Sequence, residues 1–279
     1  MRTSYHCHTM MSDGHSAASE YVRAAIAIGL DELGISDHYT LMPDTPALPL
    51  LAKGEKGGYQ PVGWSMPADA LPDYFRALRG AKQEAGDRLI VRYGLEADFF
   101  PETAAELAEI LRGYPFDYVI GSVHFVDDFP IDDSAGWWDG LSVDERNEMV
   151  RAYWSRIAAM AETGLFDIAA HLDLYKKFGH RPTVDVSAEI AAALDAIAGA
   201  GMAVELNTAG FYKPAKEFYP SPAILRECRK RGIPALVTAD AHDISHLARS
   251  YDVGVETLRN AGYTEQAIFV DRKMTLVPL

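Results

Sequence analysis

The sequence has little cysteine, no long apolar segment and too few basic residues to balance its acidic ones. Two cysteines in 279 residues, Cys7 and Cys228, exclude a disulfide scaffold and favour a reducing, cytoplasmic setting. No run of about 18 apolar residues occurs, so we expect no membrane-spanning helix and no membrane partner. The first residues, MRTSYHCHTMMSDGH, lack the apolar stretch that a signal peptide needs.

The excess of acidic residues indicates which kinds of molecule the protein can bind. Lysine and arginine contribute 26 positive charges and aspartate and glutamate 40 negative ones, so the formal net charge is −14. Because nucleic-acid phosphates are bound by basic surfaces, we expect no nucleic-acid partner. A small anionic substrate is compatible with this charge if bound metal ions supply positive charge locally. With 48 % hydrophobic and 24 % charged residues the composition is globular, and we expect residues 1–279 to form one domain.

Short apolar runs alternate with helical patterns along the chain. The predicted strands cover residues 2–6, 33–36, 89–97, 117–123, 166–171, 202–207 and 235–239. The predicted helices cover 17–29, 144–164, 186–200 and 221–232. Strands that alternate with helices pair in parallel through right-handed crossovers, so seven of them predict a barrel-like α/β fold. Residues 43–72 hold six prolines and four glycines, which predicts a long loop, either over the active site or as a surface insertion.

Histidines gather at the ends of the predicted strands. Of the nine histidines, six lie at or just after a strand's carboxyl end: His6, His8, His38, His124, His171 and His242. The carboxylates of Asp13, Glu96 and Asp240 follow the same rule. Parallel barrels carry their active sites at this end, because the loops that follow the strands converge there. One such histidine would be an ordinary core or surface residue, but six predict a shared site.

The residue types at these positions favour a metal centre. His6 and His8 are two residues apart in a predicted strand, so both imidazoles point to the same face. Mixed imidazole and carboxylate ligands suit zinc, iron(II) or manganese, and the number of candidate ligands exceeds the needs of one ion. We therefore expect two or more ions, with Glu96 as a bridge. No GxSxG, Walker loop or GxGxxG motif after a strand offers another chemistry.

Four segments resemble the motifs of the PHP family, which is named for polymerase and histidinol phosphatase. They read HCHTMMSDG at 6–14, ISDH at 35–38, GSVHF at 121–125 and TADAH at 238–242. Three further segments resemble the histidinol-phosphatase branch: GLEADF at 94–99, AHLDLYKKFGH at 170–180 and ELNTAGFYKPAKEFYPSP at 205–222. The similarity runs from residue 5 to about residue 245. It implies a distorted seven-stranded (βα) TIM-like barrel with three divalent metal ions, which are zinc, iron or manganese.

The resemblance also implies a set of ligands for each ion. The first ion would be held by His6, His8, Glu96 and Asp240. The second would share Glu96 and add His124 and His171, and the third would take Asp13, His38 and His242. His15 competes with Asp13 for the third ion, or contacts the phosphate group of the substrate.

The implied activity is hydrolysis of a phosphate monoester, with L-histidinol phosphate of histidine biosynthesis as the expected substrate. Clustered divalent ions bind phosphoryl oxygens and acidify water, so we expect in-line attack by a metal-bound hydroxide. The leaving oxygen needs a proton, and Asp240, Asp37 or a nearby histidine could supply it. We expect Asp240, Glu96 and His242 to act in catalysis.

Basic and aromatic residues after the strands are candidates for binding the rest of the substrate. Arg181 is the first candidate for the phosphate, because a guanidinium can bind it with two hydrogen bonds, and Lys176 is the second. Lys177, Lys213 and Lys216 lie in the same loops. The aromatic candidates for an imidazole ring are Trp64, Phe99, Phe125, Tyr175 and Phe211.

Two other functions are compatible with these residues. A PHP phosphoesterase could act on another small phosphate or on a nucleotide. Alternatively, the chain could be an inactive metal-binding module that regulates a partner, although every candidate ligand position is filled. The sequence carries no mark of the oligomeric state.

Overall fold

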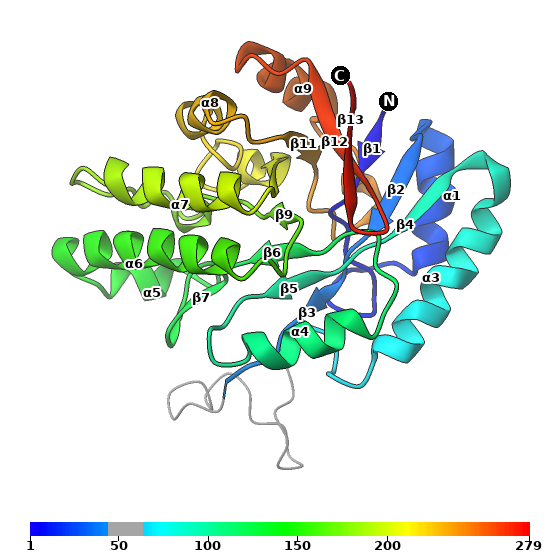
Figure 1. Ribbon diagram of the computed structural model, residues 1–279, viewed down its shortest axis with the longest axis horizontal. Helices are drawn as coiled ribbons and strands as arrows, with labels where there is room; N and C mark the ends of the chain where they lie inside the picture. Colours follow the sequence, from blue (N-terminus) through cyan, green and yellow to red (C-terminus); the bar gives the residue numbers. More distant parts are fainter. Residues whose placement is uncertain (44–63) are drawn as a thin grey trace.

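Parallel strands followed by outer helices make up most of the protein in the computed structural model, which describes residues 1–43 and 64–279 (Figure 1). The strands are β1 (Thr3–Ser4), β2 (Glu32–Ile35), β3 (His38–Tyr39), β4 (Ile90–Tyr93), β5 (Glu96–Asp98), β6 (Ile120–Ser122), β7 (Phe125–Val126), β8 (Phe129–Pro130), β9 (Ile168–Ala169), β10 (Ala203–Asn207), β11 (Ala235–Thr238), β12 (Glu265–Val270) and β13 (Lys273–Pro278). The α-helices are α1 (Ala18–Ile28), α3 (Leu71–Ala85), α4 (Ala104–Arg112), α5 (Ala135–Asp139), α6 (Val143–Glu162), α7 (Ser187–Gly199), α8 (Pro222–Lys230) and α9 (Tyr251–Asn260). Short 3₁₀ helices cover η1 (Gly86–Arg88), η2 (Leu174–Lys176), η3 (Thr208–Tyr212) and η4 (Ile244–His246). The predicted loop at 43–72 falls mostly on residues 44–63, which lie outside the described residues.

The central strands form two parallel sheets. One has the order β1-β2-β4 and the other has the order β11-β10-β9-β6-β5-β3. A parallel bridge between Cys7 and Ala241 joins the segments that follow β1 and β11, and the amide of His8 donates to the carbonyl oxygen of Ala241 at 2.8 Å. The prediction of an α/β fold with parallel strands is confirmed. In the described part of the chain the parallel strands fall into these two sheets, and no closed barrel is detected.

One predicted strand, 89–97, is two strands in the structure. β4 pairs with β2, whereas β5 pairs with β3 and β6. At the break, the hydroxyl oxygen of Tyr74, from α3, lies 3.0 Å from the carbonyl oxygen of Ile35 and 2.8 Å from that of Gly94. The ring of Tyr118 fills the adjacent space, so a Cβ atom on Gly94 would lie 2.3 Å from it. The break therefore depends on tertiary contacts that hydrophobic periodicity does not reveal.

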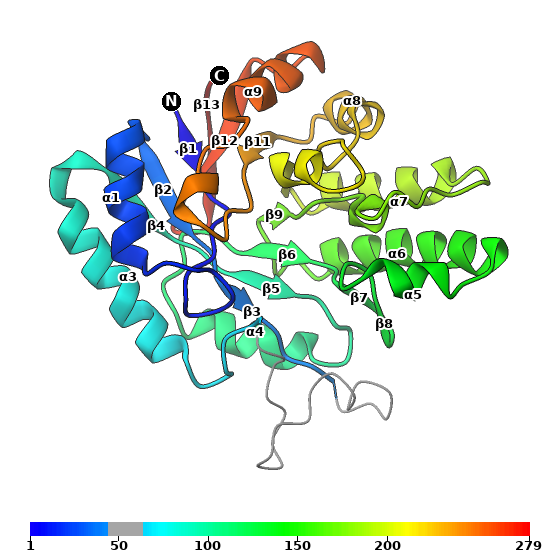
Figure 2. The ribbon, with the colours of Figure 1, turned by 180° about the vertical axis from the view of Figure 1, so that it is seen from behind.

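Two antiparallel hairpins are absent from the sequence prediction. β7 and β8 form the first, directly after His124. β12 and β13 form the second near the two termini (Figure 1), where Ala267 and Phe269 pack with Ile120, Ile168 and Leu236 of the central strands. This second hairpin lies in front of the sheets in Figure 1 and behind them in Figure 2. It covers one end of the strands and leaves the other end to the loops that carry the histidines.

The predicted helices are confirmed within a few residues, and their ends have local causes. α1 ends at Gly29, which adopts φ of 73°, a backbone conformation that glycine tolerates best. α6 begins after Ser142, whose hydroxyl accepts from the amide of Glu145 while the Glu145 carboxylate accepts from the amide of Ser142. α8 begins after Ser221, with Pro222 in its first turn.

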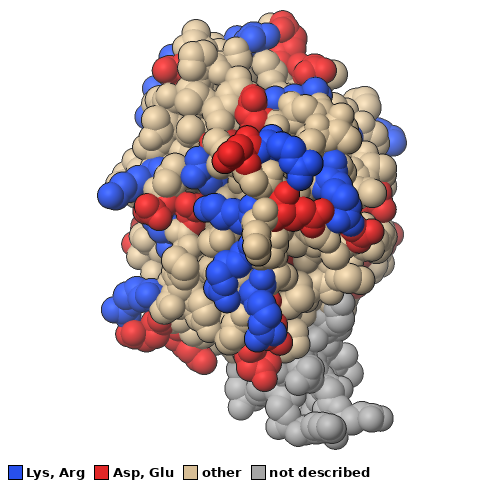
Figure 3. All heavy atoms as spheres, turned by 90° about the vertical axis from the view of Figure 1, so that its right-hand side faces the viewer, with Lys and Arg blue, Asp and Glu red and all other residues tan. Residues whose placement is uncertain are grey.

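The surface formed by α1 and α3 carries basic and acidic side chains side by side (Figure 3). Arg23 of α1 pairs with Glu84 of α3 at 2.7 Å, and Arg76 pairs with Asp73 at 2.7 Å. At least these two arginines on the face are therefore compensated by neighbouring carboxylates.

Among the described residues, no helix is both long and apolar enough to cross a lipid bilayer.

Candidate metal centre

A cavity of about 440 Å³ opens where the segments after the parallel strands converge. Its lining combines histidines, carboxylates, cations and aromatic rings: Asp13, His38, Trp64, Glu96, His124, Phe125, Pro130, Asp132, Asp133, His171, Leu174, Lys177, Ala209, Lys213, Tyr219, Asp240, His242, His246 and Arg249. The three residues predicted to act in catalysis, Glu96, Asp240 and His242, all belong to this lining.

The loop after β1 is folded around the carboxylate of Asp37. Its Oδ1 accepts from the amide of Thr9 at 2.7 Å and from the hydroxyl of Ser12 at 2.6 Å, and its Oδ2 accepts from the hydroxyl of Thr9 at 2.9 Å. Gly14 closes the turn, where a Cβ atom would lie 1.9 Å from the carbonyl oxygen of His8. The SDG part of the motif thus brings Asp13 back towards His8. Asp37 itself positions the loop and does not line the cavity.

The first group of potential ligands surrounds one oxygen of Glu96. The Nε2 atoms of His6 and His8 lie 2.9 and 3.4 Å from Glu96 Oε2. Asp240 Oδ1 lies 3.2 Å from His8 Nε2 and 3.7 Å from His6 Nε2. Asp240 has a positive φ of 48°, which directs the chain sharply after β11. The structure therefore brings together the four residues that the resemblance assigns to one ion.

A second group forms around both oxygens of Glu96. Potential ligand atoms of His38, Glu96 and His124 lie within 4.8 Å of one another. His171 Nε2 lies 3.2 Å from Glu96 Oε1, and the hydroxyl of Ser122 donates to the same oxygen. The resemblance assigns His38 to the third ion, but in the structure its Nδ1 also lies 2.9 Å from Glu96 Oε2 and so belongs to this second group as well.

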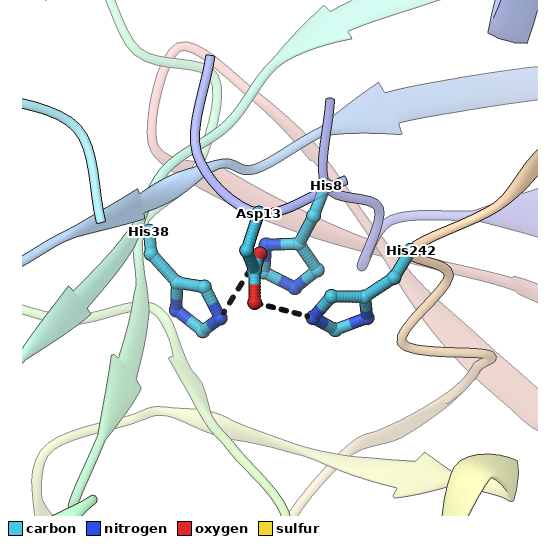
Figure 4. Close-up of side chains that lie close together, drawn as sticks. All are labelled: His8, Asp13, His38 and His242. Carbon is cyan, nitrogen blue, oxygen red and sulfur yellow. Dashed lines mark ion pairs between the residues drawn. The ribbon is translucent and has the colours of Figure 1, made fainter. Parts of the chain in front are cut away.

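A third group contains His8, Asp13, His38 and His242 (Figure 4). Asp13 Oδ2 lies 3.2 Å from His242 Nε2, and its Oδ1 lies 3.9 Å from His38 Nε2. The imidazole of His8 stacks on those of His38 and His242, with ring centroids 4.1 and 4.3 Å apart. His15 is not in this group. Its side chain is 74 % exposed and lies 3.9 Å from Asp243.

Burial and the close packing of charges shift the pKa values of these groups in opposite directions. Burial, with the nearby charges of His38 and His242, lowers the pKa of His8 to about 3. Burial would raise the pKa values of Glu96 and Asp240, but the neighbouring imidazoles hold both well below the ordinary value. The centre therefore presents negative carboxylates beside a neutral His8 imidazole, which is the protonation state that metal ligands need.

The donor atoms fit divalent metal ions. In the described part of the chain, both ring nitrogens of His8, Nδ1 of His171 and Oδ1 of Asp13 are buried without a hydrogen-bond partner. A buried polar atom without a partner is costly, and a metal ion bound by one ring nitrogen of His8 or by Asp13 Oδ1 would remove this cost at that atom. Imidazole and carboxylate donors suit zinc, iron(II) and manganese.

The cations that line the cavity differ from the two that the sequence ranked first. The ammonium of Lys176 is buried, and it donates at 2.8 Å to each of Asp173, Glu217 and the carbonyl oxygen of Phe218. Arg181 is half exposed and pairs with Glu217 at 3.0 Å. Neither residue lines the cavity. The structure places Lys177, Lys213 and Arg249 there instead.

Arg249 and Asp132 were missed by the sequence analysis. Arg249 follows Asp240 by nine residues, and its guanidinium lies 4.8 Å from the ring centre of Tyr212, with a buried Nε that lacks a partner. Asp132 accepts from Lys177 at 2.9 Å. Burial would raise the pKa of Asp132, but the positive charge of Lys177 lowers it to about 2. The sequence offered one signal for each residue: Arg249 follows a predicted strand, and Asp132 follows His124. Many ordinary loop residues share such a position, so the signal does not single these two out.

Aromatic rings form one wall of the cavity. The rings of Trp64 and Phe125 stack with centroids 6.2 Å apart, and Trp64 also contacts the ring of His38 edge-on. Of the other aromatic candidates, Phe99 and Tyr175 are buried outside the lining, and Phe211 is exposed. The cavity thus has metal-ligand, cationic and aromatic sides.

The same combination of sequence and fold occurs in known proteins. The family model described as PHP domain matches residues 4–209. A protein of Deinococcus radiodurans named "Probable histidinol-phosphatase" is 36 % identical over 273 residues, which cover 96 % of each chain. The "Histidinol-phosphatase" of Lactococcus lactis is 24 % identical, over 97 % of this chain and 95 % of that one. A crystal structure of a histidinol phosphate phosphatase from Lactococcus lactis, complexed with zinc, L-histidinol and phosphate, superposes with a TM-score of 0.80 at 22 % identity, covering 98 % of both chains.

Proposed function

This chain belongs to the PHP domain family, and on that premise we propose that it is a metal-dependent histidinol-phosphatase, which hydrolyses L-histidinol phosphate to L-histidinol and phosphate in histidine biosynthesis. The observation that carries the proposal is the convergence of nine potential ligands, seven of them in the cavity lining and His6 and His8 buried next to it: His6, His8, Asp13, His38, Glu96, His124, His171, Asp240 and His242. The 36 % identity to a relative named for this activity supports the choice of substrate.

We infer three ion positions, one at each group of ligands. His6, His8, Glu96 and Asp240 would hold the first ion, and Glu96, His124 and His171 the second, with His38 beside it. Asp13, His38 and His242 would hold the third. When bound, such ions supply positive charge for phosphoryl oxygens and increase the acidity of water, which are the two needs of phosphoester hydrolysis. We further propose that the two parallel sheets, which the bridge between Cys7 and Ala241 joins on one side, are parts of one distorted barrel with seven strand positions.

The chain's own residues orient the substrate. Lys177, Lys213 and Arg249 supply fixed positive charge on the cavity wall, where the phosphate of the substrate would lie. The stacked rings of Trp64 and Phe125 offer a flat apolar surface for the imidazole ring. Asp132 and Asp133 lie on the same lining and would face the amino group.

Protonation of the leaving oxygen falls to a group in the cavity. Asp37 is buried outside the cavity lining, and its oxygens accept the hydrogen bonds of the loop after β1, so it does not face a bound substrate. Asp240 lines the cavity, with 19 % of its side chain exposed, and lies beside His8 and His242. We propose that Asp240, ionised at rest, accepts a proton from the attacking water and passes it to the leaving oxygen, with His242 as its neighbour.

The experiment is steady-state phosphate release from L-histidinol phosphate, compared with sugar, amino-acid and nucleotide monophosphates, for zinc-, manganese- and iron-loaded protein. A kcat/KM for histidinol phosphate at least about a hundredfold above the others is expected, which is about 2.7 kcal/mol of discrimination. Equal rates across the panel, or a clear preference for another ester, would leave a phosphatase but would exclude L-histidinol phosphate as its specific substrate. Zinc binding without turnover of any ester would support the inactive module. The cytoplasmic location and the absence of a nucleic-acid partner stay predictions from composition.

A further inference from the structure

Glu205 is a buried carboxylate in the middle of β10. It does not line the cavity, but it contacts two of the potential metal ligands, His6 and His171. Its side chain is fully buried. The amide of His171 donates to Oε1 at 2.7 Å, and the side-chain amide of Asn207 donates to the same oxygen at 3.0 Å. Oε2 lies 2.7 Å from Nδ1 of His6 and accepts from the hydroxyl of Thr238 at 2.7 Å.

These four contacts show that Glu205 differs in role from the potential metal ligands. A carboxylate offers about four lone-pair positions, and all four of Glu205 are occupied by donors of the protein. The oxygens of Glu96, by contrast, face mainly imidazole nitrogens. Glu205 therefore has no free position for a metal ion, and its role has to be exerted through the residues it holds.

The contact with His6 determines which ring nitrogen is free. An anionic oxygen that also accepts from Thr238 requires a donor from His6, so the proton of the neutral imidazole lies on Nδ1. In the neutral form that a metal ligand requires, the other nitrogen, Nε2, is therefore the one without a proton, and it lies 2.9 Å from Glu96 Oε2. Only an unprotonated nitrogen can bind a metal ion.

A second path leads from Glu205 to Asp240. The Nδ2 atom of Asn207 donates to Glu205 Oε1 and also to Asp240 Oδ2, the latter at 3.2 Å. The Oδ1 atom of Asn207 accepts from the amide of Ala209 at 2.9 Å, so the orientation of the side-chain amide is fixed. Asn207 thus holds the second oxygen of Asp240 while its first oxygen faces His8.

We propose that Glu205 is a positioning residue for the metal centre, which holds His6 in its metal-binding tautomer, anchors the backbone of His171 and, through Asn207, orients Asp240. One carboxylate on β10 thereby couples the segments that follow β1, β9 and β11. Asp98 makes a similar contact with Nδ1 of His124, but it serves one histidine only. The inference rests on the proposed metal sites.

The test compares Glu205→Gln with Glu32→Gln. A glutamine at 205 keeps the shape but places an NH2 group against one of the donor pairs, either His6 with Thr238 or the amide of His171 with Asn207. We expect zinc affinity, measured by competition with a chelator, to fall by about 10- to 100-fold. The visible absorption spectrum of the cobalt-substituted protein should change as well. At saturating zinc, kcat should fall while KM stays near the wild-type value.

Glu32 provides the matched control, because it is a buried strand carboxylate away from the cavity, paired with Arg92 at 2.7 Å and hydrogen-bonded to Tyr5. Glu32→Gln should lower stability but leave zinc affinity and the cobalt spectrum unchanged. If Glu205→Gln does not fold, Asn207→Leu tests the same network, because it cuts the link to Asp240 and leaves His6 in contact with Glu205.

The possible results are distinct. The inference would be overturned, and the proposed function left intact, if a folded Glu205→Gln protein kept wild-type zinc affinity and an unchanged cobalt spectrum. Where Glu205→Gln does not fold, the same result for Asn207→Leu would overturn the inference. A wild-type protein that binds no zinc, cobalt, manganese or iron would overturn the proposed function, and the inference with it. An equal loss of zinc affinity in Glu32→Gln would also overturn it, because the effect would then come from general destabilisation.

Discussion

The Nδ1 atom of His124 lies 2.6 Å from Oδ1 of Asp98, which places the imidazole that follows β6 against the last residue of β5. Burial alone would lower the pKa of His124, but the negative charges of Asp98 and Asp132 raise it to about 10. In the same way, contact with Asp13 and Asp240 outweighs burial and raises the pKa of His242 to about 9. The metal-free protein therefore holds protonated imidazoles in its centre at neutral pH.

This protonation predicts how the metal-free protein responds to pH. A raised pKa means that the folded state binds the proton more tightly than the unfolded chain, whose histidine pKa is about 6.5. The stabilisation is fully present below that value and is lost as the pH rises towards about 10. We expect the Tm of the chelator-treated protein to fall between pH 7 and 9.5. Zinc should weaken this trend, because the metal binds neutral imidazole.

Two variants show whether protonation of His124 causes this fall in Tm. His124→Asn should flatten part of the fall in Tm, whereas His180→Asn, at a histidine outside the cavity that stacks on Trp138, should keep it. A Tm of the metal-free wild type that rises over this pH range would contradict the assignment.

Asp240→Asn tests the proposed proton transfer. The amide keeps the size of the side chain but cannot accept a proton and pass it on as a carboxylate does, so kcat should fall by about 10²- to 10⁴-fold. Zinc content is measured in the same preparation, because Asp240 also lies among the ligands of the first group. Asp243→Asn, in the adjacent loop, is the control and should retain wild-type kcat. An Asp240→Asn protein with full activity and full zinc content would remove Asp240 from the reaction.

Lys213→Gln tests the cationic wall of the cavity. Burial and the nearby positive charge of Lys177 lower the pKa of Lys213, so its ammonium lacks full compensation until an anion binds. Loss of this charge should raise KM for histidinol phosphate about tenfold, or about 1.4 kcal/mol, with metal content unchanged. Lys216→Gln, three residues further along and outside the cavity lining, should leave KM as it is. Equal KM values for the two variants would argue against a phosphate contact by Lys213.

Local sequence signals predicted much of this architecture. The predicted helix 17–29 ends at Gly29, the residue that caps α1, and the predicted helix 221–232 begins at Ser221, the residue that caps α8, because helix ends depend on neighbouring residues. The spacing of His6 and His8 predicted a shared face, and both lie against Glu96 in the structure. These features depend on backbone geometry within a few residues, which a sequence displays directly.

Features that depend on distant partners could not be predicted in this way. Tyr74 interrupts a strand that is continuous in hydrophobic pattern, and its contacts with Ile35 and Gly94 join three separate segments. Arg249 reaches the cavity from the loop after β11, and Glu205 acquires its contacts from β1, β9 and β11. In each case the chemistry depends on which side chains meet after folding, and the residue type alone allows several roles.

Lys176 shows the same dependence, and its role can be tested separately from binding. Its ammonium is buried between Asp173 and Glu217, and the side chain of Asp173 is only 2 % exposed. Lys176→Met would leave the carboxylate of Asp173 buried without its cation, which typically costs about 3–5 kcal/mol. We expect the urea midpoint of the zinc-loaded protein to fall accordingly, while KM for histidinol phosphate in the folded fraction stays unchanged. The double variant Lys176→Met with Asp173→Asn should recover part of the loss, because no uncompensated charge remains. A raised KM at wild-type stability would instead return Lys176 to the phosphate-binding role that its position in the sequence first suggested.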